Sequence, residues 1–408
     1  MKCRFCKELL EQVFLDLVTS PPSNSFLRKE DLNEPETYFP LKVFVCEKCF
    51  LVQVDEYKKS AEIFSQDYAY LSSMSRTWLE HSRQYVEMIV SRLHLKTDSR
   101  VVEIASNDGY LLQYFVERKI PCFGIEPASG TAAVAKKKGI PVIEKFFCSA
   151  LAAELKAQGT RADLIIGNNV LAHVPDINDF VAGLATFLKS GGTITMEFPH
   201  LMRLVENNQF DTIYHEHFSY LSLGVVRTIF RDHGLEIYDV DELATHGGSL
   251  RVYARHGNFD GLPVSSNVEA LVEQEHIAGM SSLHYYLGFR ERALKVKLDF
   301  LGFLLDAKRH GKKVAAYGAA AKGNTLLNFC GVKNDLVDFV VDAAPSKQGR
   351  YLPGSRIPVV NEELLKREKP DFVLVLPWNI KDEIVEQLSY IREWDAKFVV
   401  AVPSLATF

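Results

Sequence analysis

The chain has 408 residues, of which 47% are hydrophobic and 24% are charged, which is typical of a globular protein of two or three domains. Its formal net charge of -5 argues against the basic surface that nucleic acid requires, so nucleic acid is not an expected partner. No apolar run is long enough to span a bilayer, and the first residues lack the apolar core of a secretory signal, so we expect no membrane contact and a cytoplasmic location.

Two Cys-x-x-Cys pairs lie within the first fifty residues. Cys3 and Cys6 form the first pair, and Cys46 and Cys49 form the second. Four thiolates in two such turns are typical of a structural zinc site with tetrahedral geometry. Disulfide bonds or a redox dithiol are the alternatives, and a reducing cytoplasm disfavours the disulfides. We therefore predict a zinc-binding domain over residues 1–70.

The segment between the cysteine pairs is expected to depend on the metal for its folding. Residues 21–35 are polar and contain prolines, whereas 41–46 and 50–54 have the apolar character of strands that enter and leave the second cysteine turn. The segment has few core-forming residues, so zinc is expected to nucleate it.

Residues 71–258 show the alternation of apolar strands and helices that a parallel sheet with covering helices requires. The expected strands are 100–104, 122–125, 142–143, 162–167 and 193–197, and the expected helices are 109–118, 129–138, 149–157, 176–189 and 223–233, after a first helix that begins near residue 74. Two more strands, 235–240 and 250–254, are expected to form a terminal antiparallel pair. Such a pair completes the seven-stranded sheet of class I methyltransferases, so the predicted fold class is α/β with a Rossmann-like domain of that type.

Residues 259–408 are predicted to form a helical connector and a second, smaller α/β domain. Residues 267–310 carry apolar side chains at helical spacing. The following expected strands are 313–317, 337–341, 372–376 and 398–402, and the first of them leads into the turn Gly318-Ala-Ala-Ala-Lys-Gly323.

The turn after strand 100–104 is the candidate cofactor site, because ligands of open parallel sheets bind beyond the carboxyl ends of the strands. The turn lacks the Gly-x-Gly-x-x-Gly fingerprint of dinucleotide sites, and Glu126 ends the second strand, where a carboxylate can accept both ribose hydroxyls. Both facts favour S-adenosylmethionine. The alternatives are a solvated carboxylate for Glu126, a plain turn for the two asparagines and a core imidazole for His173. The predicted cofactor-binding residues are Glu103, Asn107, Asp108, Gly109, Glu126, Asn168, Asn169 and His173.

The stretch Tyr214-His215-Glu216-His217 places four proton-handling side chains in consecutive positions. Adjacent side chains of a strand point to opposite faces, so at least one of the four is expected to support the structure. A polar loop without chemistry is the alternative.

These motifs together resemble the nucleotide-sugar 3-C-methyltransferases. In chain order they are the cysteine pairs, the turn that ends in Asn107-Asp-Gly109, Gly167-Asn-Asn-Val-Leu-Ala-His-Val-Pro175, Tyr-His-Glu-His-Phe-Ser-Tyr-Leu and Thr245-His-Gly-Gly-Ser-Leu-Arg251. The resemblance implies structural Zn²⁺, S-adenosylmethionine as the methyl donor, and a C-terminal domain that holds the nucleotide. The implied substrate is a nucleotide-linked 4-keto-deoxysugar, typically dTDP-linked. Ala105 stands where the resemblance leads us to expect a glycine, which adds a methyl group near the cofactor.

The resemblance also implies catalytic roles. His217 would remove the proton from C3, next to the C4 ketone, so that an enolate attacks the methyl donor from the opposite face, with inversion at C3. Glu216 would orient or polarise the imidazole, and Tyr214 would donate a hydrogen bond to the sugar or to the enolate oxygen. Tyr70 would close over the active site, or it would be an ordinary packed tyrosine.

Substrate contacts are predicted in the second half of the chain. The turn before Lys322 opens a helix, so backbone N–H groups and Lys322 can meet a diphosphate, although a simple tight turn is the alternative. His246, Asn324 and Trp378 complete the predicted substrate-binding residues. An O- or N-methyltransferase, an NAD(P)-dependent sugar reductase and a non-catalytic zinc module are competing interpretations. The sequence does not indicate an oligomeric state.

Overall fold

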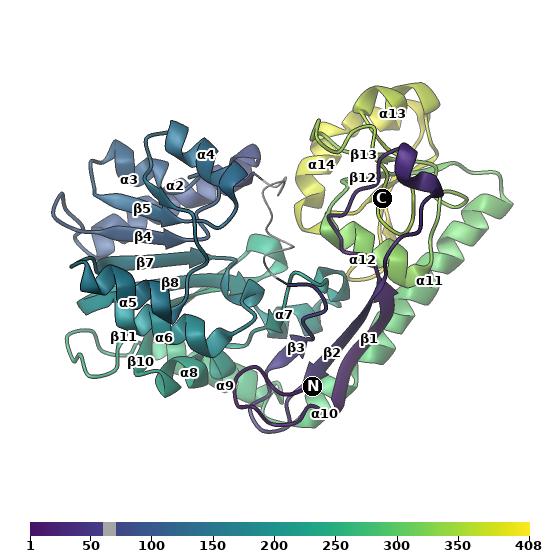
Figure 1. Ribbon diagram of the computed structural model, residues 1–408. Coiled ribbons are helices and arrows are strands. Elements are labelled where there is room, and N and C mark those ends of the chain that lie inside the picture. The colour runs from purple at the N-terminus through teal and green to yellow at the C-terminus, as the bar shows by residue number, and fades with distance from the viewer. Residues whose placement is uncertain (60–70) are drawn as a thin grey trace.

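The computed structural model describes residues 1–59 and 71–408, which form two lobes connected by an N-terminal sheet (Figure 1). The described strands lie in sheets of four, seven and six strands. Within the described residues, no helix is both long and apolar enough to cross a membrane. Tyr70, the predicted closing residue, lies outside the described residues.

The seven-stranded sheet forms the core of the first lobe. Its strand order is β10-β11-β8-β7-β4-β5-β6. Neighbouring strands from β8 to β6 are parallel, whereas β11 is antiparallel to both of its neighbours, as predicted. Because chain order reverses between β4 and β7, a ligand crevice is expected at their carboxyl ends. The strands are β4 (Val101–Ile104), β5 (Cys122–Ile125), β6 (Val142–Ile143), β7 (Ala162–Asn168), β8 (Leu188–Pro199), β10 (Leu235–Leu243) and β11 (Ser249–His256).

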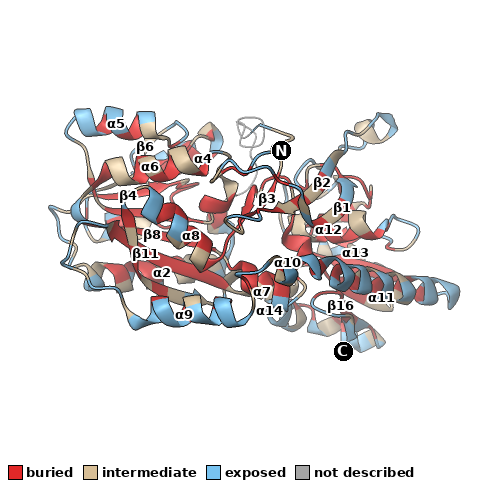
Figure 2. Cartoon of the chain, turned by 90° about the horizontal axis from the view of Figure 1, so that it is seen from below, coloured by how far each residue is buried: buried red, intermediate tan, exposed pale blue. Residues whose placement is uncertain are grey.

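Helices cover both faces of this sheet and turn their buried sides toward it (Figure 2). The helices α2, α3 and α4 pack on one face, and α5, α6 and α8 pack on the other. Polar side chains cap α2, α6 and α8, because Ser75, Asp176 and Ser222 each accept a backbone N–H of the first turn. The helices are α2 (Arg76–Arg92), α3 (Gln113–Glu117), α4 (Ser129–Lys137), α5 (Ser149–Ala157), α6 (Ile177–Phe187), α7 (Leu201–Glu206) and α8 (Leu223–Asp232).

The N-terminal sheet has the order β1-β2-β3-β9 and is antiparallel throughout. Its strands are β1 (Gln12–Ser20), β2 (Phe39–Val45), β3 (Val52–Val54) and β9 (Ser219–Tyr220). The sequence analysis missed β1, and its expectation of few core-forming residues is wrong: Phe14, Leu15 and Leu17 are buried, and the ring of Phe14 stacks on Phe289 at 4.9 Å. Strand β9 begins two residues after His217, the end of the Tyr-His-Glu-His stretch, so this sheet joins the cysteine-bearing segment to the candidate catalytic residues.

The second lobe begins with the helices α9 (Ser266–Ile277), α10 (Leu283–Leu287) and α11 (Phe289–Arg309). Its sheet has the order β14-β13-β12-β15-β16-β17, parallel except for β17. Chain order reverses beside β12, so a second crevice is expected at the carboxyl ends of β12 and β15. The remaining elements are β12 (Val314–Tyr317), α12 (Ala321–Cys330), β13 (Val340–Val341), β14 (Val359–Val360), α13 (Glu362–Glu368), β15 (Phe372–Val375), α14 (Lys381–Gln387), β16 (Lys397–Val400) and β17 (Ala406–Thr407).

The turn after β4 contains three residues with left-handed backbone conformation. The φ angles are +57° at Ala105, +49° at Asn107 and +75° at Gly109. A Cβ at Gly109 would lie 2.4 Å from Cδ1 of Ile140, so this position requires glycine. Ala105 adopts a conformation that costs an L-residue about 1–2 kcal/mol, which is a physical reason to expect glycine there.

We therefore predict that Ala105→Gly raises the free energy of unfolding by up to about 1 kcal/mol. Relief of the left-handed strain, about 1–2 kcal/mol, exceeds the backbone entropy that glycine loses on folding, about 0.5–1 kcal/mol. Urea unfolding measures the difference. Ala133→Gly, on the exposed side of α4, is the control and should lower stability by about 1 kcal/mol. An Ala105→Gly variant that is less stable than the native protein would contradict this account.

Candidate active site

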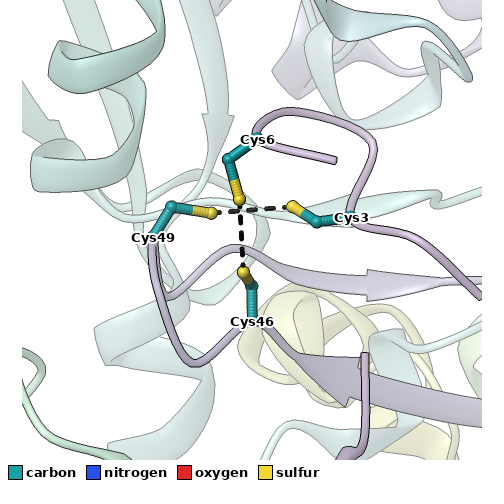
Figure 3. Close-up of side chains that lie close together, drawn as sticks. All are labelled: Cys3, Cys6, Cys46 and Cys49. Carbon is teal, nitrogen blue, oxygen red and sulfur yellow. Dashed lines mark hydrogen bonds between the residues drawn. The ribbon is translucent and has the colours of Figure 1, made fainter. Parts of the chain in front are cut away.

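The four predicted zinc ligands converge from two turns of the N-terminal segment (Figure 3). The Sγ atoms of Cys3 and Cys49 are 3.6 Å apart, those of Cys6 and Cys46 are 3.5 Å apart, and all four lie within 4.8 Å of one another. A tetrahedral zinc ion with Zn–S bonds of about 2.3 Å places its ligands roughly 3.8 Å apart, so the cluster fits zinc. No disulfide bond joins these four cysteines. Gln53 Nε2 donates to Cys3 Sγ at 3.3 Å, which orients that ligand.

A cavity of about 440 Å³ lies at the carboxyl ends of β4, β5 and β7. Five predicted cofactor residues line it: Asn107, Glu126, Asn168, Asn169 and His173. Glu126 accepts the backbone N–H groups of Asn107 and Ala128, each at 2.9 Å. Burial raises the pKa of Glu126, while these hydrogen bonds act in the opposite direction. Each carboxylate oxygen can accept a second hydrogen bond, so this oriented group can still receive ribose hydroxyls.

Three predicted cofactor residues support the turn instead of lining the cavity. Among the described residues, Glu103, Asp108 and Gly109 are absent from the cavity wall. Glu103 is fully buried within β4, and burial raises its pKa well above the ordinary value. The carboxylate of Asp108 accepts a hydrogen bond from Ser73 and lies 3.6 Å from Lys138 Nζ. The prediction placed all three in contact with the cofactor, whereas the structure places Glu103 inside β4 and uses the Asp108 carboxylate to hold Ser73.

The cavity wall also contains residues that the sequence analysis did not single out. Ser72 lies in the short 3-10 helix Ser72–Met74 before α2, Trp78 lies in the first turn of α2, and Phe146 and Phe147 follow β6. The indole of Trp78 lies 5.3 Å from the ring of His246 between centroids. The position of Phe146 and Phe147 a few residues after the end of a strand was the available signal, whereas α2 approaches the cavity only through tertiary packing.

His173 in the cavity wall contacts a second imidazole, that of His217, which packs behind it. The ring centroids of His173 and His217 are 4.6 Å apart at an interplanar angle of 74°. His217 Nδ1 donates to the carbonyl of Thr212 at 3.0 Å, and His173 Nδ1 donates to the carbonyl of Glu216 at 2.7 Å. A carbonyl only accepts, so each neutral ring keeps its proton on Nδ1 and presents Nε2 as a proton acceptor.

Burial keeps both imidazoles neutral. It lowers the pKa of His173 to about 4, and it lowers the pKa of His217 well below the ordinary value, with a further contribution from His173. A neutral imidazole at pH 7 can act as a general base, whereas an imidazolium cannot. The geometry and the protonation state therefore both allow His217 to accept a proton.

The four residues of the Tyr-His-Glu-His stretch point in different directions because they form a tight turn. His217 N–H donates to the Tyr214 carbonyl at 3.0 Å, and the rings of these two residues lie side by side, with centroids 4.0 Å apart. His215 turns to the N-terminal sheet, where its Nε2 donates to the Pro40 carbonyl at 3.1 Å. His215 thus supports the structure, as the sequence analysis expected for at least one of the four.

Glu216 corrects the prediction that its carboxylate orients the imidazole. Its Oε1 accepts from Asn24 Nδ2 at 2.7 Å, so the carboxylate holds the loop after β1. The main-chain carbonyl of Glu216 orients His173 instead. Burial raises the pKa of this carboxyl.

The C-terminal lobe brings a charged cluster to the imidazoles. Lys322 Nζ donates to Asn379 Oδ1 at 2.7 Å and lies 4.6 Å from the indole of Trp378. Burial lowers the pKa of Lys322 to about 8, and its charge contributes to lowering the pKa of His217. Trp378 Nε1 donates to Oδ2 of Asp211 at 2.7 Å. The sequence analysis missed Asp211, whose pKa burial raises to about 7.

The other two predicted substrate residues differ in their placement. His246 lines the cofactor cavity, and its Nε2 lies 3.0 Å from Nδ2 of Asn169. Burial lowers the pKa of His246 to about 4. Asn324 is buried, and its Nδ2 donates to the carbonyl of Ser23 at 2.6 Å. Asn324 therefore fastens the N-terminal segment to α12, which corrects its assignment as a substrate ligand.

The seven-stranded sheet with its terminal antiparallel strand, together with the cavity beyond β4, defines a class I S-adenosylmethionine-dependent methyltransferase. Three family models match the chain: a zinc binding domain over residues 3–64, a methyltransferase domain over 78–240 and a C-methyltransferase C-terminal domain over 244–403. The chain is 34% identical over 405 residues to the C-methyltransferase NovU of Streptomyces niveus, a match that covers 98% of this chain and 95% of that protein. The chain therefore belongs to the sugar C-methyltransferase family that its motifs resemble. It is an S-adenosylmethionine-dependent C-methyltransferase with a structural zinc site.

Two solved methyltransferase structures are similar to less than half of this chain. A methyltransferase of Clostridium acetobutylicum is 12% identical, with a TM-score of 0.37 over 44% of this chain and 92% of that one. The magnesium protoporphyrin IX methyltransferase of Synechocystis is 16% identical, with a TM-score of 0.33 over 45% of this chain and 82% of that one.

The pKa of His173 predicts a specific acid sensitivity. Between about pH 6.5 and 4 the unfolded chain protonates this imidazole and the folded protein does not. The neutral His173 imidazole therefore makes its full contribution to the free energy of unfolding above pH 6.5. That contribution decreases by about 1.4 kcal/mol per pH unit as the pH falls from 6.5 toward 4. Urea unfolding of native protein and His173→Gln near pH 7, 6 and 5 measures this, with the exposed His284→Gln as control. As the pH falls, the free energy of unfolding should decrease less steeply in His173→Gln than in the native protein, by up to about 1.4 kcal/mol per pH unit. Equal slopes in the two proteins would contradict the assignment.

Proposed function

We propose that the protein methylates C3 of a nucleotide-linked 4-keto-deoxysugar, most simply a dTDP-linked one, through an enolate that His217 forms. The observation that carries this proposal is the position of His217. Its neutral ring contacts His173 in the wall of the donor cavity, and the cationic Lys322 of the second lobe acts on it from another side. A base between a methyl-donor cavity and a substrate-holding lobe suits carbon methylation.

The chemistry requires a base because a carbon atom with its proton in place does not attack a methyl group. His217 Nε2 takes the C3 proton, and the electron pair of the C–H bond delocalises onto the C4 oxygen. C3 of this enolate then forms a bond to the methyl carbon as the carbon–sulfur bond breaks, which leaves a neutral thioether. His217 later releases its proton to water. A positioned base of this kind typically contributes about a hundred- to ten-thousandfold to the rate.

Two further side chains suit the enolate. The ring of Tyr214 lies beside that of His217, tilted by 36°, so its hydroxyl can donate to the sugar or to the developing oxyanion. Lys322 brings a buried positive charge to the same region, where it can stabilise either the enolate or the substrate diphosphate. His217, Tyr214 and Lys322 are the residues that we assign to the sugar side of the reaction.

The nucleotide part of the proposal is supported by a likeness between the two lobes. Glu126 ends the second strand of its unit and accepts the backbone N–H groups of Asn107 and Ala128. Asp342 follows β13, the second strand of its unit, and accepts those of Ala319 and Ala344 at 2.7 and 2.8 Å. Each carboxylate thus accepts one N–H from the turn after the first strand of its unit and one from the residue two positions after itself. We infer that Asp342 accepts a nucleoside hydroxyl as Glu126 accepts those of the donor ribose.

The direct test uses donor labelled with ¹³C in its methyl group and a panel of nucleotide-linked 4-keto sugars. We expect one sugar to gain a C–CH3 group that NMR still detects after acid hydrolysis and reduction. A labelled methyl found on oxygen or nitrogen would overturn the proposal.

Four zinc-bound thiolates suit a reducing compartment, and we propose the cytoplasm as the location.

A matched pair of variants tests the assignment of the base. His217→Asn should lower kcat by about a hundred- to ten-thousandfold, because asparagine can replace the hydrogen bond to Thr212 and cannot accept the proton. His215→Asn changes the same residue type two positions away, where the side chain faces Pro40, and kcat should stay within a few-fold of native. Steady-state kinetics on the methylated sugar measures both, and equal losses would remove His217 from this role.

A further inference from the structure

Arg4 lies inside the first cysteine turn, and its side chain leaves the metal site for the methyltransferase lobe. Its Nη1 donates to the carbonyl of Pro175 at 2.7 Å, and its Nη2 donates to the carbonyl of Val54 at 2.5 Å. Arg4 is only 8% exposed. Its guanidinium carbon also lies 5.4 Å from the ring centroid of Phe218. A residue from a zinc turn thus touches two segments that are far away in the sequence.

These two segments carry the two imidazoles. Pro175 lies two residues after His173, and both line the donor cavity. Phe218 directly follows His217, and its N–H donates to the carbonyl of Ala172 at 2.8 Å. Arg4 therefore occupies the place where the loop of His173 meets the turn of His217. Its planar guanidinium can hold several acceptors in a fixed geometry.

The other end of Arg4 is fastened to the metal site. Its backbone N–H donates to Gln53 Oε1 at 2.8 Å, and Nε2 of the same Gln53 donates to Cys3 Sγ at 3.3 Å. A second contact runs in parallel, because Asn178 Nδ2 donates to the carbonyl of Phe5 at 2.9 Å. The first cysteine turn is thus bound to the methyltransferase lobe through Arg4 and Phe5.

We propose that Arg4 is a positioning residue through which the zinc turn holds the loop of His173 against His217. The structural part of this proposal is independent of the reaction, whereas its kinetic part rests on the proposed function. The zinc turn then acts on the chemistry without touching substrate or donor. It fixes the distance between two side chains that come from different ends of the active site.

Arg4→Met and Arg4→Lys test this proposal in the zinc-loaded full-length protein. Lys48→Met is the matched control, because Lys48 is an exposed basic residue of the second cysteine turn. In Arg4→Met we expect one zinc per chain by elemental analysis and amide hydrogen exchange at least fivefold faster in residues 171–176 and 218. We also expect kcat to fall at least tenfold, with KM for the keto sugar within about threefold. Arg4→Lys should recover part of kcat, since an ammonium can keep one carbonyl contact, and Lys48→Met should resemble the native protein.

Unchanged exchange in residues 171–176 of Arg4→Met would overturn the proposal, and so would an unchanged kcat. Loss of zinc from Arg4→Met would also overturn it, because Arg4 would then maintain the metal site itself. If the native protein methylates no keto sugar in the panel, the proposed function fails. The difference in exchange between Arg4→Met and Lys48→Met would still decide whether Arg4 positions the loop.

Discussion

The edge-to-face contact between His173 and His217 is the interaction on which the site depends. One ring follows β7, the strand that borders the donor cavity, and the other precedes β9, the strand that joins the N-terminal sheet. Two main-chain carbonyls hold the protons of both rings on Nδ1, and burial keeps the rings neutral. A proton acceptor is thereby placed at the boundary between the methyl donor and the lobe that we assign to the nucleotide.

The three parts of the chain share the task of maintaining this contact. The methyltransferase sheet positions His173, and pairing of β3 with β9 anchors the turn of His217 to the cysteine-bearing segment. The second lobe reaches the same turn from the other side, where Thr325 of α12 donates to the carbonyl of Ile213 at 2.8 Å. The metal-held turns give the N-terminal sheet a fixed end, and that sheet supports the turn to which we assign the base.

Sequence reasoning predicted the features that local pattern determines. Apolar alternation and turn residues located the strands of the seven-stranded sheet, and cysteine spacing located the metal ligands. It failed where the direction of a side chain depends on an unusual backbone conformation or on packing against distant parts of the chain. The left-handed backbone at Ala105 and Asn107 turns Asp108 away from the cavity, and no spacing rule reveals this. Asn324 lies on the face of α12 that packs on the N-terminal segment. Arg4 and Asp211 have partners more than 160 positions away in the chain, so neither has a local signal.

The central claim is that His217 removes the C3 proton before any methyl group moves. Proton exchange at C3 in deuterium oxide, without methyl donor, tests it most directly because no later step can mask the result. The account predicts that the native protein introduces deuterium at C3 of the keto sugar and that His217→Asn does so at least a hundredfold more slowly. Equal rates of exchange in the two proteins would contradict it.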